Sequence, residues 1–548
     1  MLSGTSAPSC AATLWRSLFV TSTRGTSTRG TSTGPAARSA TAPCRVAAVG
    51  VVLVALVAPA SAVERAHLDV ALETIRADDV QRHVEVLADD ALEGREAGSR
   101  GGLAAGNYLA KHLSAAGCEP AGDDGSFFQI FGSGYRNLLA LLPGTDPTLA
   151  QEVILVGAHY DHVGYGNRSN SFGPFGYIHN GADDNASGTA CLLELVDAFA
   201  ALPTRPRRSI LFALWDGEEK GLLGSQHWLA HPTLPRQRLR FAFNVDMVGR
   251  LRDDHVEVLG SRTAAGLRQV VSRQNADENL QLDFSWEMKA NSDHHPFFAA
   301  SVPVLMFHTG LHDDYHRPSD DVERIQSDGI ARVTRLAFRV LCDLADATSA
   351  TPFRTASRRE TPASRNQFEQ PLANPPPRLG AGWRRNPEDA PEDGVIVTHV
   401  VRGTPAERAD LRAGDRIVRC NDRPVASENA LRVTVLAAKE PVKLSVRRAG
   451  ETEPRDLSIQ LDGDPVRVGL AWQEDEAEPG TVLINQVVPA SAAYLAGVRP
   501  QDRVYEVAGQ RFSSSEEFRR LITTLPSPLP LLVERQGRLL PLQLELAE

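Results

Sequence analysis

The fold is decided by residues 153–188, VILVGAHYDHVGYGNRSNSFGPFGYIHNGADDNASG, where a short apolar run leads into polar residues. Val153 to Val156 predict a buried β-strand, and His159 and Asp161 come directly after it. A loop rich in glycine follows, and residues 181–188 open an apolar segment that is typical of a helix. Because a strand, a loop and a helix follow one another, this stretch predicts one unit of an α/β fold.

Three later apolar runs end in the same way, with an acidic residue or a histidine just beyond. They are residues 209–215 before Glu218 and Glu219, residues 239–245 before Asp246, and residues 302–307 before His316. Ligand crevices of open parallel sheets lie outside the carboxyl ends of the strands, so these side chains are expected to converge. Strands that alternate with helical segments predict a doubly wound, mostly parallel α/β sheet.

Segments upstream of this sheet also have clear patterns. Residues 103–115 have apolar spacing near 3.6 and, with the rest of residues 67–117, predict helices that cover one face of the sheet. Residues 137–142 and 153–156 predict two strands that pair around the turn at residues 143–147.

Six motifs, in this order and spacing, resemble peptidase family M28, a family of co-catalytic zinc peptidases that are mostly aminopeptidases. The motifs are AHYDH from Ala158, NGADDNASG from Asn180, LWDGEE from Leu214, NVDMVGR from Asn244, NSDHHPF from Asn291 and YHRPSDD from Tyr315. Residues 88–117 look like the N-terminal segment of that family, so the likeness covers about residues 78–346.

The resemblance implies two zinc ions per chain. His159 and Asp246 would bind one zinc, Glu219 and His316 the other, and Asp183 would bridge them. Glu218 would take a proton from a zinc-activated water and pass it to the leaving amine. The supporting residues would be Asp161 behind His159, Asp320 behind His316, Asp184 joined to Asp183 by a cis peptide bond, and Asp293 in a nearby loop. The remaining histidines, His162 among them, are expected in structural or rim positions.

Each of these residues has a simpler explanation when taken alone. An aspartate after a strand is commonly a helix cap, which would account for Asp183 or Asp184. Glu218 and Glu219 could be solvated, and His316 could be an ordinary surface histidine. The complete set in register favours the metal site. HExxH is absent, and G-x-S-x-G occurs only at residues 30–34 in the low-complexity N-terminal segment, so neither a thermolysin-type zinc site nor a serine-hydrolase elbow is predicted.

The last third of the chain contains a repeated module. TPAERADLRAGDRI from Thr404 matches SAAYLAGVRPQDRV from Ser491, and both copies resemble PDZ domains. In that family a loop binds the terminal carboxylate of a peptide; the matching residues are Leu379 and Gly380 in the first copy and Val468, Gly469 and Leu470 in the second. Peptide capture by strand addition is one interpretation, and packing on the catalytic domain or assembly is the other.

The first 62 residues have the features of a secretory signal peptide with a long n-region. Residues 1–46 contain five arginines and no acidic residue, residues 47–58 are apolar, and residues 60–62 form an A-x-A site. A membrane anchor is the less favoured alternative, since the apolar run is shorter than the ~20 residues that a span needs. The predicted parts are a signal peptide at 1–62, an M28-like domain at 63–346, a Pro/Ser/Arg-rich linker at 347–377 expected to be extended and poorly ordered, and small β-rich PDZ-like domains at 378–462 and 463–548.

Charge and cysteine content exclude some classes of partner and of fold. A formal net charge of −10 argues against nucleic acid as a partner. Cys118, Cys191, Cys342 and Cys420 are widely spaced without C-x-x-C, so neither a disulfide framework nor a zinc finger is predicted, although a pair between Cys118 and Cys342 stays open.

Together these patterns predict an exported zinc-dependent aminopeptidase, periplasmic or extracellular, that removes N-terminal residues from peptides. Its expected partners are peptide substrates and, through the PDZ-like modules, protein C-termini, with no stable membrane span after signal cleavage. Two alternatives remain. One is another M28-type activity, a carboxypeptidase or a glutaminyl cyclase; the other is a peptide-binding adaptor whose α/β domain is inert.

Overall fold

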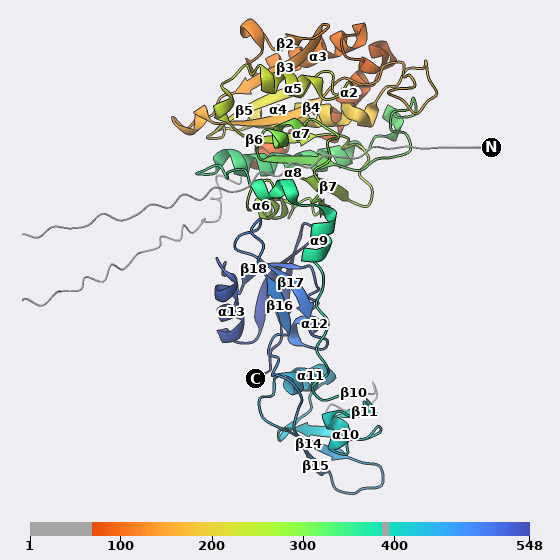
Figure 1. Cartoon of the computed structure of the whole chain (residues 1–548), viewed down its shortest axis with the longest axis vertical. Coiled ribbons are helices and arrows are strands. Elements are labelled where there is room, and N and C mark those ends of the chain that lie inside the picture. Colours follow the sequence, from red (N-terminus) through yellow and green to blue (C-terminus); the bar gives the residue numbers. More distant parts are fainter. Residues whose placement is uncertain (1–67, 386–393, 548) are drawn as a thin grey trace, which may run out of the picture. The chain divides into compact units, whose positions relative to one another are not determined.

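The computed structural model describes residues 68–385 and 394–547 (Figure 1), so the predicted signal peptide lies outside the described residues. The first part of the chain is built on a nine-stranded sheet in the order β1-β3-β5-β4-β6-β9-β7-β8, with β2 paired to β3. The strands are β1 Glu119–Pro120, β2 Phe128–Phe131, β3 Tyr135–Leu142, β4 Val153–His159, β5 Ser209–Trp215, β6 Leu239–Val245, β7 His255–Leu259, β8 Gln281–Phe284 and β9 Val304–His308.

The centre of this sheet is parallel, as the sequence predicts. Strands β5, β4, β6 and β9 run parallel to one another, whereas β3 is antiparallel to β5 and β7 is antiparallel to β9. Every residue of β4 and of β5 is buried, since both faces of the sheet are covered. The predicted pairing of residues 137–142 with residues 153–156 is wrong, because the chain returns through a helix and places β5 between β3 and β4.

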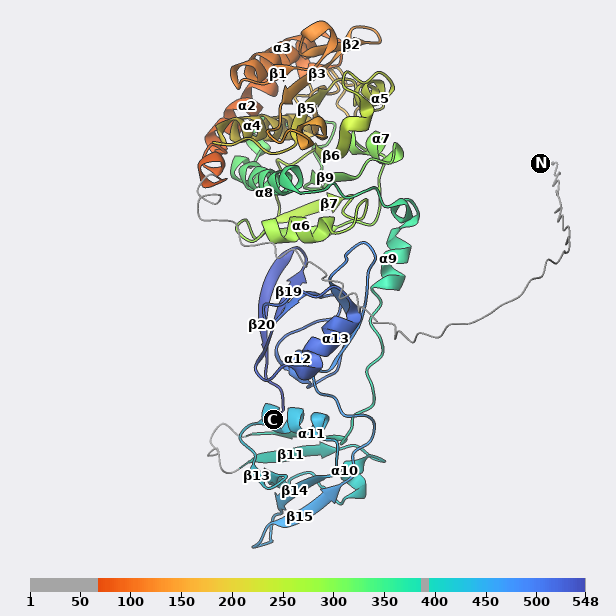
Figure 2. The same cartoon turned by 90° about the vertical axis from the view of Figure 1, so that its left-hand side faces the viewer.

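Helices cover the two faces of the sheet (Figure 2). The main ones are α2 Ala77–Leu87, α3 Arg100–Ala115, α4 Gly188–Ala201, α5 Leu223–Ala230, α6 Leu267–Gln274, α7 His294–Ala299 and α8 Ser327–Asp346. Ile154 and Val156 of β4 belong to the core that holds α2, α3, α4 and α8, whereas Leu155 belongs to the core that holds α5 and α7. Since neighbouring strand residues point to opposite faces, one strand contributes to both cores.

Short turns of 3-10 and π helix join these elements. They are η1 Asp90–Arg95, η2 Asp123–Gly125, η3 Leu149–Gln151, the π turn η4 Ala182–Ser187, η5 Arg236–Arg238, η6 Val322–Arg324 and η7 Thr355–Arg359. Cys118, Cys191, Cys342 and Cys420 are free, which removes the Cys118–Cys342 alternative. Within residues 68–385 and 394–547, the structure contains no helix with both the length and the apolar character that a membrane crossing requires.

Two antiparallel sheets follow, each with its own core, as the tandem module predicts. The first contains β10 Ala381–Arg384, β11 Val395–Val400, β12 Arg416–Cys420, β13 Arg423–Pro424, β14 Val442–Arg447 and β15 Arg455–Ile459, with helices α10 Pro405–Arg408 and α11 Glu428–Ala437. The second contains β16 Leu470–Gln473, β17 Val482–Val487, β18 Arg503–Val507, β19 Leu529–Arg535 and β20 Arg538–Leu544, with helices α12 Ala492–Leu495 and α13 Ser515–Thr524.

The linker at residues 347–377 differs from its prediction as an extended and poorly ordered segment. It contains η7 and the helix α9 Pro362–Phe368. This helix begins with a capping box, in which Thr361 and Ser364 each accept a hydrogen bond from the other's backbone N–H. Pro362 occupies the first turn, where its missing N–H costs nothing. Local capping chemistry therefore orders part of a segment whose overall composition is typical of a linker.

Candidate metal centre

Two groups of potential metal ligands meet beyond the carboxyl ends of β4, β5 and β6. The first group is His159, Asp184 and Asp246, and the second is His162, Asp184, Glu219 and His316. Within each group, one donor atom from every residue lies within 4.8 Å of the others. Asp184 belongs to both groups, so its carboxylate joins two adjoining sites.

The donor atoms are spaced as ligands of a small cation. His159 Nε2 lies 3.3 Å from Asp184 Oδ1 and 3.3 Å from Asp246 Oδ1. His316 Nε2 lies 3.0 Å from Asp184 Oδ2 and 3.2 Å from Glu219 Oε2. Tetrahedral zinc with bonds of about 2.0–2.1 Å separates its ligands by about 3.3 Å, so both sets of distances fit zinc.

The two histidines present lone pairs to these carboxylates. His316 Nδ1 lies 2.9 Å from the carbonyl oxygen of Asn170, which can only accept, so Nδ1 carries the proton. His159 Nδ1 donates in the same way to the carbonyl oxygen of Asp161, at 3.1 Å. His316 Nε2 is buried and makes no hydrogen bond, although two carboxylate oxygens lie close to it. A buried lone pair that faces carboxylates fits a cation between them.

Negative charge is concentrated here. Burial alone would lower the pKa of His316, but the carboxylates of Asp184 and Glu219 raise it to about 10, so without a metal ion Nε2 carries a proton that a bound ion would replace. Burial raises the pKa of Glu218 well above its usual range; His159 opposes this effect and Glu219 adds to it. Buried carboxylates are costly unless a cation compensates them, and this cost supports a metal site.

Asp184, rather than the predicted Asp183, takes the place between the two ligand groups, and Asp183 has a supporting place instead. Asp183 Oδ1 accepts hydrogen bonds from Ser187 Oγ at 3.0 Å and from the Gly249 N–H at 2.6 Å, while Oδ2 lies 3.0 Å from His312 Nε2. Asp183 belongs to neither ligand group, since both of its oxygens already have partners. The predicted cis peptide bond between Asp183 and Asp184 is also wrong, because the cis bond joins Asp184 to Asn185.

Asp161 supports the turn that carries the two glutamates. Its Oδ1 accepts a hydrogen bond from the backbone N–H of Glu218 at 3.0 Å, and its Oδ2 lies 3.4 Å from the N–H of Glu219. Its backbone oxygen, rather than its carboxylate, is the partner of His159. Asp161 therefore fixes the end of β4 and the turn after β5 relative to each other.

Asp320 supports the aspartate pair rather than His316. Its Oδ2 accepts the backbone N–H groups of Asp183 and Asp184, at 3.0 and 3.1 Å, and its Oδ1 lies 3.2 Å from Arg250 Nη2. Burial and the charge of Asp183 raise the pKa of Asp320 to about 6. Through Asp320, the loop that contains His316 anchors the start of η4.

Asp293 lies behind the first ligand group, at the start of α7. It accepts a hydrogen bond from Ser225 of α5, and burial raises its pKa to about 7 despite the opposing effect of His159. This contact joins α5 to α7, and the supporting role of Asp293 stays a prediction.

His162 has a place that the sequence does not predict. It lies in the second ligand group, with Nδ1 2.8 Å from Glu219 Oε1. Its Nε2 is buried without a hydrogen bond. The spacing of three residues from His159 is the only sequence signal, and it is weak because the strand has already ended between them.

Arg95 is a second residue that sequence reasoning missed. Its guanidinium is fully buried and donates to the carbonyl oxygens of Leu87, Tyr160, Asn180 and Gly181 at 2.5–2.9 Å. Two of these carbonyls directly precede η4 and a third directly follows His159. One side chain thus ties together the two segments that carry His159 and Asp184.

The predicted carboxylate loops of the C-terminal modules have matching conformations. Gly380 and Gly469 have φ of +76° and +87°, values that favour glycine. The carbonyl of Leu379 accepts from Ala406 of α10, and that of Val468 accepts from Ala493 of α12, each at 3.0 Å. Leu470 begins β16, the edge strand of its sheet.

A tryptophan follows each loop and reaches the helix beside the edge strand. Trp383 Nε1 donates to the carbonyl of Glu428 at 3.1 Å. Trp472 Nε1 donates to Ser515 Oγ at 2.8 Å, and its ring packs edge-on against Phe518 at 4.9 Å. Part of the space between strand and helix is therefore filled by the protein's own side chains.

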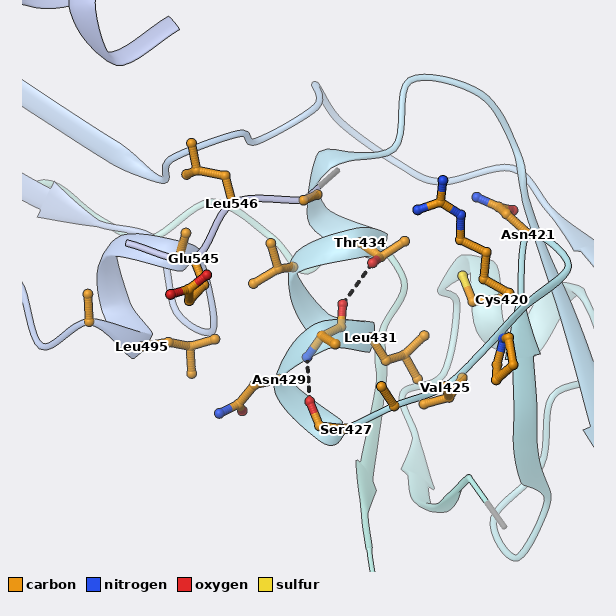
Figure 3. Close-up of a pocket in the computed structure, with 18 of the residues that line it drawn as sticks. Cys420, Asn421, Val425, Ser427, Asn429, Leu431, Thr434, Leu495, Glu545 and Leu546 are labelled. Carbon is orange, nitrogen blue, oxygen red and sulfur yellow. Dashed lines mark hydrogen bonds between the residues drawn. The ribbon is translucent and has the colours of Figure 1, made fainter. Parts of the chain in front are cut away.

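A hollow of about 870 Å³ lies elsewhere in the C-terminal third (Figure 3). It is lined by α11, by the segment before this helix, and by residues of α12 and of the chain near Leu546. None of its lining residues belongs to the two ligand groups.

The α/β domain that carries the two adjoining ligand groups matches a family of peptidases. Residues 137–341 match the model of peptidase family M28, and residues 377–461 and 483–535 each match a PDZ domain model. The chain thus contains an M28 peptidase domain followed by two PDZ domains, as the motifs predict.

Similar proteins include named peptidases. Leupeptin-inactivating enzyme 1 of Streptomyces exfoliatus is 29% identical over 45% of this chain and 51% of its own length. Aminopeptidase YwaD of Bacillus subtilis is 32% identical over 32% of this chain and 38% of its own length. The chain thus spans about half or less of these relatives. A solved zinc aminopeptidase from Bacillus subtilis is 16% identical over 51% of this chain and 98% of that chain, with a TM-score of 0.41.

Proposed function

We propose that this protein is an aminopeptidase that uses two zinc ions per chain. The observation that carries the proposal is the carboxylate of Asp184, which is shared by the two ligand groups. One zinc would be held by His159, Asp184 and Asp246, and the other by Asp184, Glu219 and His316, with His162 beside it. Mixed nitrogen and oxygen donors, three from the protein for each ion, leave a position open for substrate or water, which is typical of catalytic zinc.

The chain's own residues then have separate tasks. Bound zinc supplies an acidified water and polarises the substrate carbonyl. Glu218 would hold the proton that the water loses and return it to the leaving amine, and burial, which raises its pKa, makes it a stronger base than an exposed glutamate. Asp161 keeps Glu218 in place through the backbone N–H of that residue. The excess of carboxylates suits a substrate whose reactive end is a positively charged amine.

The names of the similar peptidases favour the aminopeptidase over the carboxypeptidase and the cyclase. The A-x-A site at residues 60–62 supports export to the periplasm or the outside of the cell. The PDZ domains support peptide binding, with protein C-termini as ligands of Leu379 and Gly380 in one domain and of Val468, Gly469 and Leu470 in the other.

The test is to compare residues 63–548 with the variant Glu218→Gln. The wild type is expected to hold about two zinc ions and to hydrolyse leucine-p-nitroanilide, while the variant keeps its zinc and loses about 10²–10⁴-fold in kcat. Glu323→Gln, an exposed change of the same kind, serves as the control and should leave both measurements unchanged. If the protein binds zinc but does not hydrolyse this substrate, the activity would have to be sought at other peptide ends or on other acyl groups. If it binds no zinc after supplementation, the peptide-binding adaptor with an inert α/β domain would be the remaining hypothesis.

A further inference from the structure

A third group of potential metal ligands lies outside the site described above. His83 of α2, His112 of α3 and Asp197 of α4 each offer one donor atom, and these atoms all lie within 4.8 Å of one another. The three residues come from three helices on the same face of the sheet. The proposed peptide hydrolysis uses none of them.

The closest pair of donors has the spacing found in the catalytic groups. His112 Nε2 lies 3.1 Å from Asp197 Oδ1, compared with 3.0–3.3 Å between the donors around Asp184. The rings of His83 and His112 adjoin, with centroids 4.9 Å apart. The distance between His112 Nε2 and Asp197 Oδ1 is close to one edge of a tetrahedral zinc site, and the adjoining ring brings His83 beside this pair.

His83 is oriented as a metal ligand. Its Nδ1 lies 2.7 Å from the hydroxyl of Tyr108, an outer partner of the kind that fixes the tautomer of a ligating histidine. When the Tyr108 hydroxyl accepts the proton of Nδ1, Nε2 carries the lone pair that a cation needs.

Glu194 leaves negative charge next to His83. It is 1% exposed, its Oε2 accepts the Arg76 N–H at 3.0 Å, and its Oε1 lies 3.8 Å from His83 Nε2. Glu194 therefore adds a second acidic side chain beside the ligand group that contains Asp197. With Asp197 nearby, a divalent cation would offset the charge of both acids.

We propose that His83, His112 and Asp197 form a further metal site, which takes zinc or a similar borderline divalent cation. Two imidazoles and one carboxylate, completed by water, are a donor set that suits zinc. The ion joins α2 and α3 to α4, the helix that directly follows η4 and Asp184. Its role is therefore structural, and it stabilises the segment on which the catalytic groups depend.

The direct test is zinc content. The protein is stripped with a chelator, saturated with zinc, desalted and analysed by mass spectrometry. The variant His112→Ala/Asp197→Ala is expected to hold one zinc per chain fewer than the wild type. The control His255→Ala/His399→Ala, which removes two histidines outside every ligand group, should match the wild type. Equal zinc content in wild type and variant overturns the proposal, and this difference does not depend on how much zinc the catalytic groups hold.

A second measurement covers the case in which the alanine variant folds poorly. In a His159→Ala/His316→Ala background, zinc is expected to raise Tm by several degrees through binding at the third group. Adding the milder changes His112→Gln and Asp197→Asn should abolish this shift. An undiminished shift in the four-residue variant overturns the proposal.

Discussion

Asp183 and Asp184 are neighbours of the same type, and their surroundings give them different tasks. Asp183 accepts hydrogen bonds from Ser187 and Gly249, while Asp184 faces both His159 and His316. Asp184→Asn is therefore expected to reduce zinc from about two ions per chain to less than one, because both ions share its carboxylate. Asp183→Asn should keep its zinc and lose stability instead. Zinc analysis with Tm separates the two, and the reverse result would restore the bridging role predicted for Asp183.

The sequence identifies most residues of the candidate site. His159, Glu219, Asp246 and His316 are found because each follows an apolar strand, and the carboxyl ends of parallel strands meet. The choice between adjacent aspartates could not be made, since it depends on a hydrogen bond from Gly249, 66 positions away. His162 was missed for a similar reason, because its partner Glu219 comes from another strand end.

At the scale of elements, Arg95 holds β4 and η4 together. Arg95→Met removes the donor of four buried carbonyl oxygens, so the loss in the free energy of unfolding is expected to be about 3–5 kcal/mol. The matched control is Arg100→Met, because Arg100 is exposed and pairs with Glu93 on the surface; its cost should stay below about 1 kcal/mol. Urea unfolding measures both, and equal costs would show that the buried contacts of Arg95 carry no special weight.

The boundaries of the central strands agree well with the apolar runs of the sequence. The order of the strands in the sheet differs from the predicted pairing. Residues 209–215 and 239–245 coincide with β5 and β6, since buried parallel strands are continuous apolar runs. Strand order depends on where the chain re-enters the sheet after α4, and no local pattern encodes that position. The same limit applies to the linker, where composition predicts disorder but a capping box produces α9.

At the scale of the whole molecule, buried ion pairs connect the M28 domain to the second PDZ domain. Arg268 of α6 donates to both carboxylate oxygens of Glu534 at 3.0 and 3.1 Å, and the two side chains are 6% and 0% exposed. The backbone N–H of Leu282 donates to the carbonyl of Gln536 at 2.8 Å. These partners are 266 and more than 250 positions apart, so no sequence pattern reveals them. Of the two interpretations of the second module, these contacts favour packing on the catalytic domain over peptide capture.

This packing predicts strong coupling between Arg268 and Glu534. Removing either charge takes away the closest partner of a buried charge, so Arg268→Ala and Glu534→Ala should each cost about 3–5 kcal/mol in the free energy of unfolding. The double variant should cost clearly less than the sum, because the second change removes the charge whose closest partner the first change removed. Arg408 and Asp462, an exposed pair within the first PDZ domain, provide the control cycle, with coupling below about 1 kcal/mol. Additive costs at Arg268 and Glu534 in urea unfolding would mean that this ion pair does not hold the module on the peptidase domain.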